Sequence, residues 1–324
     1  MKAAVQSRYG PPEVVRVAEV HRPAPGDGEL LIRISATTVN RTDCAYRAAR
    51  PRVIMRLAGG LTRPRHPVLG CEFAGVVAEV GGGVTSFAVG DRAFGWIEGR
   101  FGAHAEYLVV PERASMARTP ATVPDDVAAA ATEGSHYALS AIRGTRVRAG
   151  HDVLVNGATG AIGSAAVQLL RHLGARVTAV CGPEALDLVR DLGADRVIDR
   201  SAEDFTQDDA TYDVVIDAVG KSSFGRCRRL LKPRGRYVST ELGPGAQNPF
   251  LALVTPLARG RRVVFPIPRD DPGMMAEIGD LMAGGSFRPL IDRRYPLEQI
   301  VDAYRYVETG RKTGSVVIDV APAG

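Results

Sequence analysis

The chain has 324 residues, of which 45% are hydrophobic and 24% charged, so it can bury a large core, and its length suits two domains better than one. Its formal net charge of +5 arises from 41 basic and 36 acidic residues that are interleaved, and the lack of a long basic run argues against a nucleic-acid partner. No segment approaches the roughly 20 apolar residues of a membrane-spanning helix, and residues 1–9 carry no apolar signal core, so we expect a cytoplasmic protein with no membrane partner.

The four cysteines, Cys44, Cys71, Cys181 and Cys227, lie far apart and form no Cys-x-x-Cys pair. This spacing predicts neither a disulfide framework nor a structural zinc site. We expect free thiols in a reducing compartment.

Short runs rich in β-branched residues, separated by Gly and Pro clusters, fill the chain from residue 1 to about residue 111. Residues 29–34 and 75–80 are examples. The pattern predicts a β-rich domain with irregular connections.

Beyond residue 127, short apolar runs alternate with helical patterns. The predicted strands are residues 152–155, 175–180, 196–198, 214–218 and 236–239, with helices at 163–173 and 183–192. This alternation predicts βαβ units around a parallel sheet. The tail contains two further helical patterns and a final strand, at residues 274–282, 297–308 and 315–320.

A glycine-rich turn directly follows the first of these strands and opens an alanine-rich helix. Its residues are Asn156, Gly157, Ala158, Thr159, Gly160, Ala161, Ile162 and Gly163. Gly157 allows a tight turn, Gly160 lets the backbone approach a pyrophosphate, and Gly163 lets the helix pack closely on the sheet. The first N–H groups of the helix then point at the phosphates. We predict that the turn binds a dinucleotide cofactor; the alternative is a glycine-rich turn without a ligand.

The end of the second strand, about 20 residues after the turn, normally has an Asp or Glu that binds the adenosine ribose and repels a 2′-phosphate. This chain has Cys181 there. The missing carboxylate favours NADPH over NADH if a cation pairs with the phosphate; Arg200 is the first candidate, and Arg311 or Lys312 the second. Arg200 is alternatively a solvated surface arginine. Glu184 is expected to cap the next helix rather than to bind ribose.

Seven motifs follow one another along the chain: residues 39–43 (VNRTD), 68–75 (VLGCEFAG), 89–95 (VGDRAFG), the glycine-rich turn, 192–195 (LGAD), 217–220 (DAVG) and 231–235 (LKPRG). In this order they resemble the medium-chain dehydrogenases/reductases, and most of all the zinc-independent, NADPH-dependent quinone oxidoreductase branch. The match runs across nearly the whole chain.

The resemblance implies an α/β protein with a GroES-like, β-rich catalytic domain and a Rossmann domain with a doubly wound parallel sheet. The catalytic domain would be residues 1–120 completed by 265–324, with the nucleotide-binding domain, 121–264, inserted and the active site in the cleft between them. Family members commonly form homodimers through the nucleotide-binding domain. The apolar run 262–267 would serve as an edge for this pairing, or would be buried within one chain.

Zinc-dependent members bind a catalytic metal through a Cys, a His and a third ligand, commonly Cys. The resemblance places Asn40, Cys71 and Glu133 at these positions, and only one of them is a typical strong ligand. Residues 95–104 contain none of the four structural cysteines of those members. We therefore predict no zinc. The alternative is an unusual metal site made from Cys44, His66, Cys71, Glu72 and Glu133.

Zinc-free relatives reduce quinones or α,β-unsaturated carbonyl compounds (enones), which implies hydride transfer from NADPH to a small electrophilic substrate. The catalytic candidates are Asn40, Glu133, Tyr137 and Tyr46. Asn40 would donate a hydrogen bond to the substrate, or else only to the turn it occupies. Glu133 and His136 would move protons, or would be a helix-dipole partner and a structural histidine. The resemblance places Tyr137 near the nicotinamide, and Tyr46 lies one position from a tyrosine of some relatives.

The residues expected near the nicotinamide half of the cofactor follow the later strands: Val219, Gly220, Ser239, Thr240 and Phe265. Asp43 and Glu72 are expected to be structural partners of arginines.

Two other functions remain alternatives. One is an alcohol dehydrogenase with an atypical zinc site, which would lose activity with a chelator. The other is a non-catalytic nucleotide-binding protein of the same fold, because a fold does not determine a function.

Overall fold

The structure, a computed structural model, describes residues 1–97, 99–258, 260–266 and 270–320. The chain divides into two compact units, Met1–Glu133 with Arg269–Gly324, and Gly134–Pro268. The first boundary falls at Glu133, inside the long helix α3 (Asp125–Thr145), whereas the resemblance implies a boundary at residue 120. No helix among the described residues is long and apolar enough to span a bilayer.

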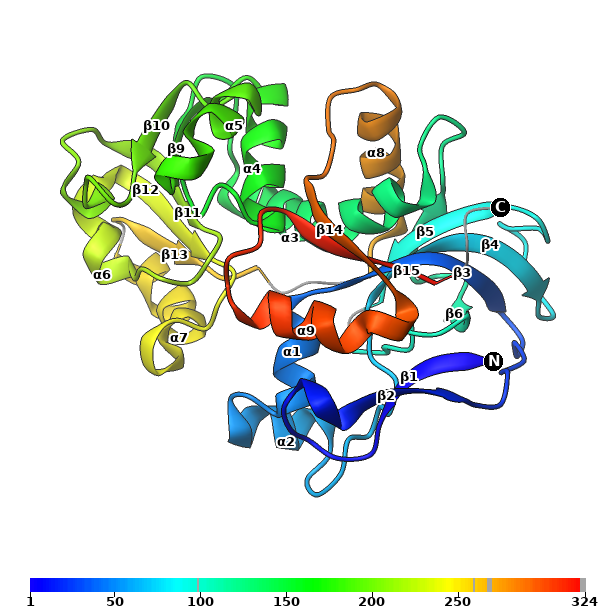
Figure 1. The fold of residues 1–324 in the computed structure, drawn as a ribbon. Helices are drawn as coiled ribbons and strands as arrows, with labels where there is room; N and C mark the ends of the chain where they lie inside the picture. Colours follow the sequence, from blue (N-terminus) through cyan, green and yellow to red (C-terminus); the bar gives the residue numbers. More distant parts are fainter. Residues whose placement is uncertain (98, 259, 267–269, 321–324) are drawn as a thin grey trace. The chain divides into compact units, whose positions relative to one another are not determined.

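The first unit is built on a seven-stranded sheet with the order β14-β15-β3-β4-β5-β7, in which β6 also pairs with β3 (Figure 1). Its strands are β3 (Glu29–Val39), β4 (Glu72–Val80), β5 (Arg92–Trp96), β6 (Tyr107–Pro111), β7 (Ser115–Arg118), β14 (Ile291–Pro296) and β15 (Ser315–Asp319). All pairs are antiparallel except β14 with β15. A separate antiparallel pair joins β1 (Lys2–Gln6) to β2 (Val15–Glu19). This is the β-rich domain that the sequence predicts.

Four helices lie within this unit: α1 (Arg41–Ala48), α2 (Arg52–Gly59), α8 (Pro272–Ala283) and α9 (Ile300–Glu308). Alternate residues of β3, Leu30, Ile32 and Ile34, point into one apolar core with Phe73 of β4. A second apolar core forms where α9 packs on β3 and β15, and Tyr304 is part of it. Strands from the early part and from the end of the chain therefore belong to one sheet.

The second unit is a six-stranded, wholly parallel sheet with the order β10-β9-β8-β11-β12-β13. The strands are β8 (Asp152–Asn156), β9 (Arg176–Cys181), β10 (Arg196–Asp199), β11 (Tyr212–Asp217), β12 (Leu231–Ser239) and β13 (Arg262–Val264). The helices are α4 (Ala161–His172), α5 (Leu186–Asp191), α6 (Phe224–Cys227) and α7 (Gln247–Val254). Counted along the chain, the strand order is that of a Rossmann sheet, whose order reverses between the first and fourth strands, here β8 and β11. The predicted fold class is confirmed.

Two predicted elements differ in detail. The helix expected at residues 183–192 begins as a 3-10 turn, Pro183–Ala185, and becomes α5 only at Leu186, because the backbone of Ala185, with φ −128° and ψ 14°, departs from the α-helical conformation. The helix expected at 297–308 likewise begins as a 3-10 turn before α9. In the described part of the run 262–267, Arg262–Val264 form a strand at the end of the sheet order; residue 267 lies outside the described residues.

Candidate active site

The glycine-rich turn lies at the carboxyl end of β8, where the strand order reverses. Gly157 has a φ of +85°, a backbone conformation that favours glycine, and a Cβ atom there would lie 2.9 Å from the Cβ of Val219. A Cβ on Gly163 would lie 2.1 Å from the carbonyl oxygen of Gly157. These two glycines therefore serve close packing within the turn.

Gly160 has a different environment, which fits a ligand. A Cβ on Gly160 would meet no atom closer than the Gly157 oxygen at 3.8 Å, so its outer side is open. Gly160 is the N-cap of α4, and no side chain caps this helix. The first N–H groups of α4 are then available to an anion, and the residues present fit a pyrophosphate.

Asp217, at the end of β11, organises the backbone beside this turn. Its carboxylate accepts hydrogen bonds from the amide of Asn156 at 3.0 Å, from the N–H of Gly220 at 3.1 Å and from the N–H of Ser222 at 2.9 Å. These bonds hold Val219 and Gly220 against the glycine turn, and this role of Asp217 was not predicted. A carboxylate accepting several N–H groups in a buried place is well stabilised.

The carboxyl ends of β9 and β10 bring Cys181 and Arg200 together, because the N–H of Arg200 donates to the Cys181 carbonyl at 2.9 Å. The Cys181 side chain is buried, and this burial raises the pKa of its thiol to about 11. Glu184 lies 4.0 Å from the Arg200 guanidinium, and neither group is buried. Glu184 provides no side-chain cap for the 3-10 turn or for α5, so the capping role expected for it is wrong.

The remaining candidates near the cofactor are distributed over the second unit. Ser239 is buried at the end of β12, and its hydroxyl accepts from the N–H of Glu241 at 3.2 Å. Tyr137 lies one turn after Gly134 on α3, and a Cβ on Gly134 would lie 2.7 Å from the Ala161 oxygen, so this face of α3 contacts the start of α4. Phe265 instead lines a hollow of about 340 Å³ beside β13.

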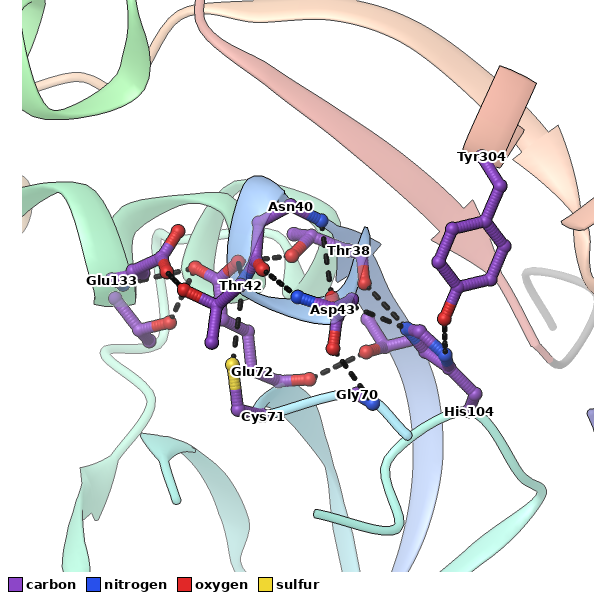
Figure 2. Close-up of polar contacts among 12 residues, drawn as sticks. Thr38, Asn40, Thr42, Asp43, Gly70, Cys71, Glu72, His104, Glu133 and Tyr304 are labelled. Atoms are coloured by element: carbon purple, nitrogen blue, oxygen red, sulfur yellow. Dashed lines mark hydrogen bonds and ion pairs between the residues drawn. The ribbon is translucent and has the colours of Figure 1, made fainter. Parts of the chain in front are cut away.

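A second group of candidates forms a buried polar cluster in the first unit, centred on Glu72 at the start of β4 (Figure 2). The Glu72 carboxylate accepts from the hydroxyl of Thr38, from the hydroxyl of Thr132 at 2.9 Å and from the N–H of Glu133 at 2.9 Å. Its partners are hydroxyl, amide and N–H groups, so the expectation that Glu72 pairs with an arginine is wrong. A buried carboxylate is stable only when its lone pairs are used, and here they are.

Asn40 occupies the N-cap of α1. Its side-chain oxygen accepts from the N–H of Asp43 at 2.9 Å, and the Asp43 carboxylate accepts from the N–H of Asn40, which together form a capping box. Its amide nitrogen donates to the sulfur of Cys71 and to Glu72, both at 3.3 Å. Asn40 thus fixes the turn it occupies and also orients Cys71 and Glu72.

Glu133, which α3 contributes to this cluster, is buried, and the hydroxyl of Thr42 donates to it at 3.1 Å. Lys312, on the loop before β15, is half-buried; its ammonium donates to the Gly314 carbonyl at 2.5 Å. Burial lowers the pKa of Lys312, while the carboxylates of Glu133 and Glu72 act in the opposite direction. Lys312 and Arg311, considered for the cofactor phosphate, therefore belong to the first unit and not to the unit of the glycine turn.

The donor set of this cluster does not suit a catalytic zinc ion. Asn40 points its N–H groups at Cys71 and Glu72, and the Glu72 oxygens already accept four hydrogen bonds. Zinc needs the lone pairs of thiolate, imidazole or carboxylate groups in a tetrahedral arrangement. Over residues 1–97, 99–258, 260–266 and 270–320, no three His, Cys, Asp or Glu side chains group as metal ligands.

Tyr46 and His66 form an aromatic group with Phe101 next to α1. The ring centroids of Tyr46 and Phe101 are 4.6 Å apart in an edge-to-face arrangement, and those of His66 and Phe101 are 5.5 Å apart. Burial lowers the pKa of His66.

A buried hydrogen-bond network that the sequence did not reveal supports the turn at the start of α1. The carboxylate of Asp43 accepts from the N–H of Gly70 at 3.0 Å, and the Nε2 of His104 lies 2.7 Å from the Thr38 carbonyl (Figure 2). A carbonyl only accepts, so Nε2 carries the proton, and Nδ1 accepts from the Tyr304 hydroxyl at 3.3 Å. Burial lowers the pKa of His104 to about 4, which keeps it neutral.

Comparison with known proteins gives matches over nearly the whole chain. The alcohol dehydrogenase GroES-like domain matches residues 26–121, and the zinc-binding dehydrogenase domain matches residues 192–318. The 2-methylene-furan-3-one reductase of Solanum lycopersicum is 30% identical over 336 residues, which cover 99% of this chain and 80% of that protein. The chain belongs to the medium-chain dehydrogenase/reductase superfamily.

Other members of the superfamily support this assignment. The chloroplastic NADPH-dependent alkenal/one oxidoreductase of Arabidopsis thaliana is 29% identical and covered to 80% by this chain, which aligns over 99% of its own length. The structure of the quinone oxidoreductase from Coxiella burnetii superimposes with a TM-score of 0.89 at 26% identity and 99% coverage of both chains. The predicted family and the predicted class of enzyme, an oxidoreductase, are confirmed.

His104 makes the stability of this superfamily member depend on pH. Its pKa lies below the ordinary value of 6.5, at about 4, so between these values the unfolded chain binds a proton that the folded chain does not. Stability is therefore complete above about pH 6.5 and falls as the pH drops toward about 4, by about 2 to 3 kcal/mol from this group at pH 4.5. Chemical denaturation at pH 7.5 and 4.5 measures the difference.

The variant His104→Gln, whose amide can still donate to the Thr38 carbonyl, should lose this part of the pH dependence. His172→Gln, at an exposed position of α4, serves as the matched control and should keep it. An equal pH dependence in wild type and His104→Gln would contradict a buried neutral imidazole.

Proposed function

We propose that this chain is an NADPH-dependent reductase that transfers a hydride to a quinone or to an α,β-unsaturated carbonyl compound. The open, uncapped glycine turn at the end of β8 is the observation that supports a dinucleotide cofactor most directly. The substrate class is supported by the names of three relatives: the 2-methylene-furan-3-one reductase, the NADPH-dependent alkenal/one oxidoreductase and the quinone oxidoreductase.

The proposed cofactor residues are Asn156 to Gly163, Cys181, Arg200, Val219, Ser239 and, more weakly, Phe265. NADPH, when bound, supplies the hydride. The chain's part is to bind and orient it: backbone N–H groups of α4 bind the pyrophosphate, and Arg200 pairs with the 2′-phosphate after exchanging its long contact with Glu184. Tyr137 is proposed to lie against the nicotinamide.

The polar cluster around Glu72 is proposed to act on the substrate. Reduction of an enone places a negative charge on its oxygen, and this charge is then quenched by a proton at the α-carbon. Glu133 and Lys312 are titratable groups of the cluster that can hold or move this proton, and the hydroxyl of Thr42 donates to Glu133. Asn40 acts as the group that positions Cys71 and Glu72, and Tyr46 as a further hydrogen-bond donor.

We further propose that the reaction needs no zinc. The arrangement of Asn40 as a donor to Cys71 and Glu72 supports this, because an amide N–H group in the place of a ligand repels rather than binds a cation. The four free cysteines support a reducing compartment, for which we propose the cytoplasm. The proposed domains are residues 1–120 with 265–324 and residues 121–264, which place the boundary before α3 rather than inside it.

A homodimer through the second unit is proposed from two features. Among the described residues, β13 pairs with a strand on one side only, so its other edge is open to a partner strand. Phe250, Leu253 and Leu257, on α7 and the turn after it, are 64%, 76% and 83% exposed, which is a large apolar surface beside that edge.

Turnover is the first test of the proposed function. Chelator-treated protein is expected to oxidise NADPH with a quinone or an enone from a small panel. Activity with an alcohol or aldehyde that appears only after zinc is added would establish the atypical alcohol dehydrogenase instead. Cofactor binding without turnover of any electrophile would establish the non-catalytic alternative.

The choice of cofactor is tested with Arg200→Gln. The loss of one charge-assisted contact to a phosphate should raise the KM for NADPH by roughly tenfold and leave the KM for NADH unchanged. Arg190→Gln, which removes an exposed arginine paired with Asp187 on α5, is the matched control and should change neither. Equal KM values for NADPH in wild type and Arg200→Gln would exclude Arg200 as the phosphate partner.

The homodimer is tested by sedimentation velocity of the wild type and of Leu253→Asp with Leu257→Asp. The wild type should sediment with twice the chain mass of 34.5 kDa, and the double variant with the mass of one chain. A wild-type protein that stays monomeric at micromolar concentration would contradict the proposal.

A further inference from the structure

The segment between Cys44 and Cys71 has an unusual charge composition. It contains six arginines and no acidic residue, although acidic residues are nearly as frequent as basic ones in the chain as a whole. The arginines are Arg47, Arg50, Arg52, Arg56, Arg63 and Arg65. Neither the cofactor turn nor the Glu72 cluster uses this charge.

Helix α2 and the residues on either side of it present most of this charge to solvent. Arg50, Arg52, Arg63 and Arg65 are exposed, while Arg47 is buried and paired with Glu308. No described acidic side chain forms an ion pair with any of these four exposed arginines. Unpaired arginines at this density create a positive surface that attracts anions.

The loop folds back onto the end of α2 and brings Arg63 and Arg65 to that end of the helix. The N–H of Arg65 donates to the Gly59 carbonyl at 2.6 Å. Gly60 has a φ of +118°, and a Cβ there would lie 2.2 Å from the Arg63 oxygen, so only glycine permits this close return. Arg63 and Arg65 therefore lie beside the C-terminus of α2.

The same surface exposes three large apolar side chains. Val53, Leu57 and Leu61 are 73%, 67% and 65% exposed. Val53 and Leu57 are four residues apart on α2 and share one face of the helix, and Leu61 follows just after its end. An apolar face flanked by arginines is the pattern of a helix that lies in the interface of a membrane.

The opposite side of this segment is attached to the rest of the first unit. The hydroxyl of Tyr9 donates to the Gly60 carbonyl at 2.7 Å, and the Arg56 guanidinium stacks 5.6 Å from the Tyr9 ring centroid. A Cβ on Gly59 would lie 3.6 Å from the Tyr46 ring, which places that face of α2 toward α1 (Figure 1). The attachment leaves Val53 and Leu57 directed away from the core.

We propose that α2 and residues 60–65 form a docking surface for an anionic lipid bilayer. Val53, Leu57 and Leu61 would enter the boundary between headgroups and acyl chains, and the arginines would pair with lipid phosphates. A nucleic acid would also attract the arginines, but it would not bury three exposed aliphatic side chains. A bilayer matches both.

This inference goes beyond the proposed reductase activity and does not depend on it. It revises the expectation of no membrane partner, which rests on the lack of a spanning segment, because a peripheral surface needs none. A reductase held on a bilayer would meet apolar electrophiles where they concentrate, in the lipid.

The experiment is co-sedimentation of the full chain with vesicles at low and physiological ionic strength. We expect binding to vesicles with 30% phosphatidylglycerol in phosphatidylcholine, little binding to pure phosphatidylcholine, and weaker binding as salt screens the charges. Turnover is not needed for this readout, so its outcome is independent of the reductase assay.

Two double variants separate the charged and the apolar contributions. Arg63→Gln with Arg65→Gln should lower the partition coefficient by about fivefold per arginine. Val53→Ser with Leu57→Ser should lower it by roughly tenfold, because the exposed apolar area can no longer be buried. All four side chains are exposed, so both variants should keep the melting temperature of the wild type.

The matched controls remove similar groups elsewhere in the first unit. Arg16→Gln with Arg113→Gln removes two exposed arginines, and Val89→Ser removes an aliphatic side chain that is 63% exposed. Both should bind vesicles like the wild type. The proposal would be overturned by equal binding to neutral and anionic vesicles, or by no binding to either. Equal losses of binding in the control variants would also overturn it. So would binding of the protein to single-stranded DNA that is unchanged in the variant Val53→Ser with Leu57→Ser.

Discussion

The first unit depends on the burial of one carboxylate, that of Glu72. Its four hydrogen bonds connect the end of β3, the start of α1 and the middle of α3, three segments that lie far apart in the sequence. A buried carboxylate without these partners would cost several kcal/mol, so the partners and the carboxylate hold one another in place. Asn40 and Glu133 owe their positions to this arrangement.

A single buried carboxylate, that of Asp217, also organises part of the second unit. Asp217 accepts hydrogen bonds from N–H groups of the loop after β11 and from the amide of Asn156. These bonds fix the two strand ends between which the sheet order reverses. The glycine turn is held at its start by the bond from the Asn156 amide. Its backbone remains open at Gly160, where a ligand's phosphates can approach.

Much of the fold follows from local patterns in the sequence. The strands of the parallel sheet are apolar runs between turn signals, and β9 is displaced by only one residue from its predicted place. The glycine turn was recognisable because glycine has a physical use at three spacings. The strand β13 was harder to define, because only Arg262–Val264 pairs with β12 and the apolar run continues beyond it.

The hydrogen-bond partners of the site were not predictable from the sequence. Thr38, Thr132 and His104 look like ordinary residues of strands and helices, and only the tertiary structure brings them to Glu72 and Asp43. The sequence suggests an arginine as the partner of Glu72, whereas its hydroxyl, amide and N–H partners come from three other segments. The surface of α2 is not evident from the sequence for another reason: periodicity marks its apolar residues, but not whether they face the core or the solvent.

The place of β15 in its sheet determines which unit can complete its sheet first during synthesis of the chain. β15 lies between β14 and β3, so the antiparallel edge of β3 at residues 36–39 stays unpaired until residues 316–319 have been made. The second unit, in contrast, is continuous from residue 134 to 268 and contains all of its own strands. The nucleotide-binding half can therefore complete its sheet during synthesis, while the half that was begun first must wait for the end of the chain.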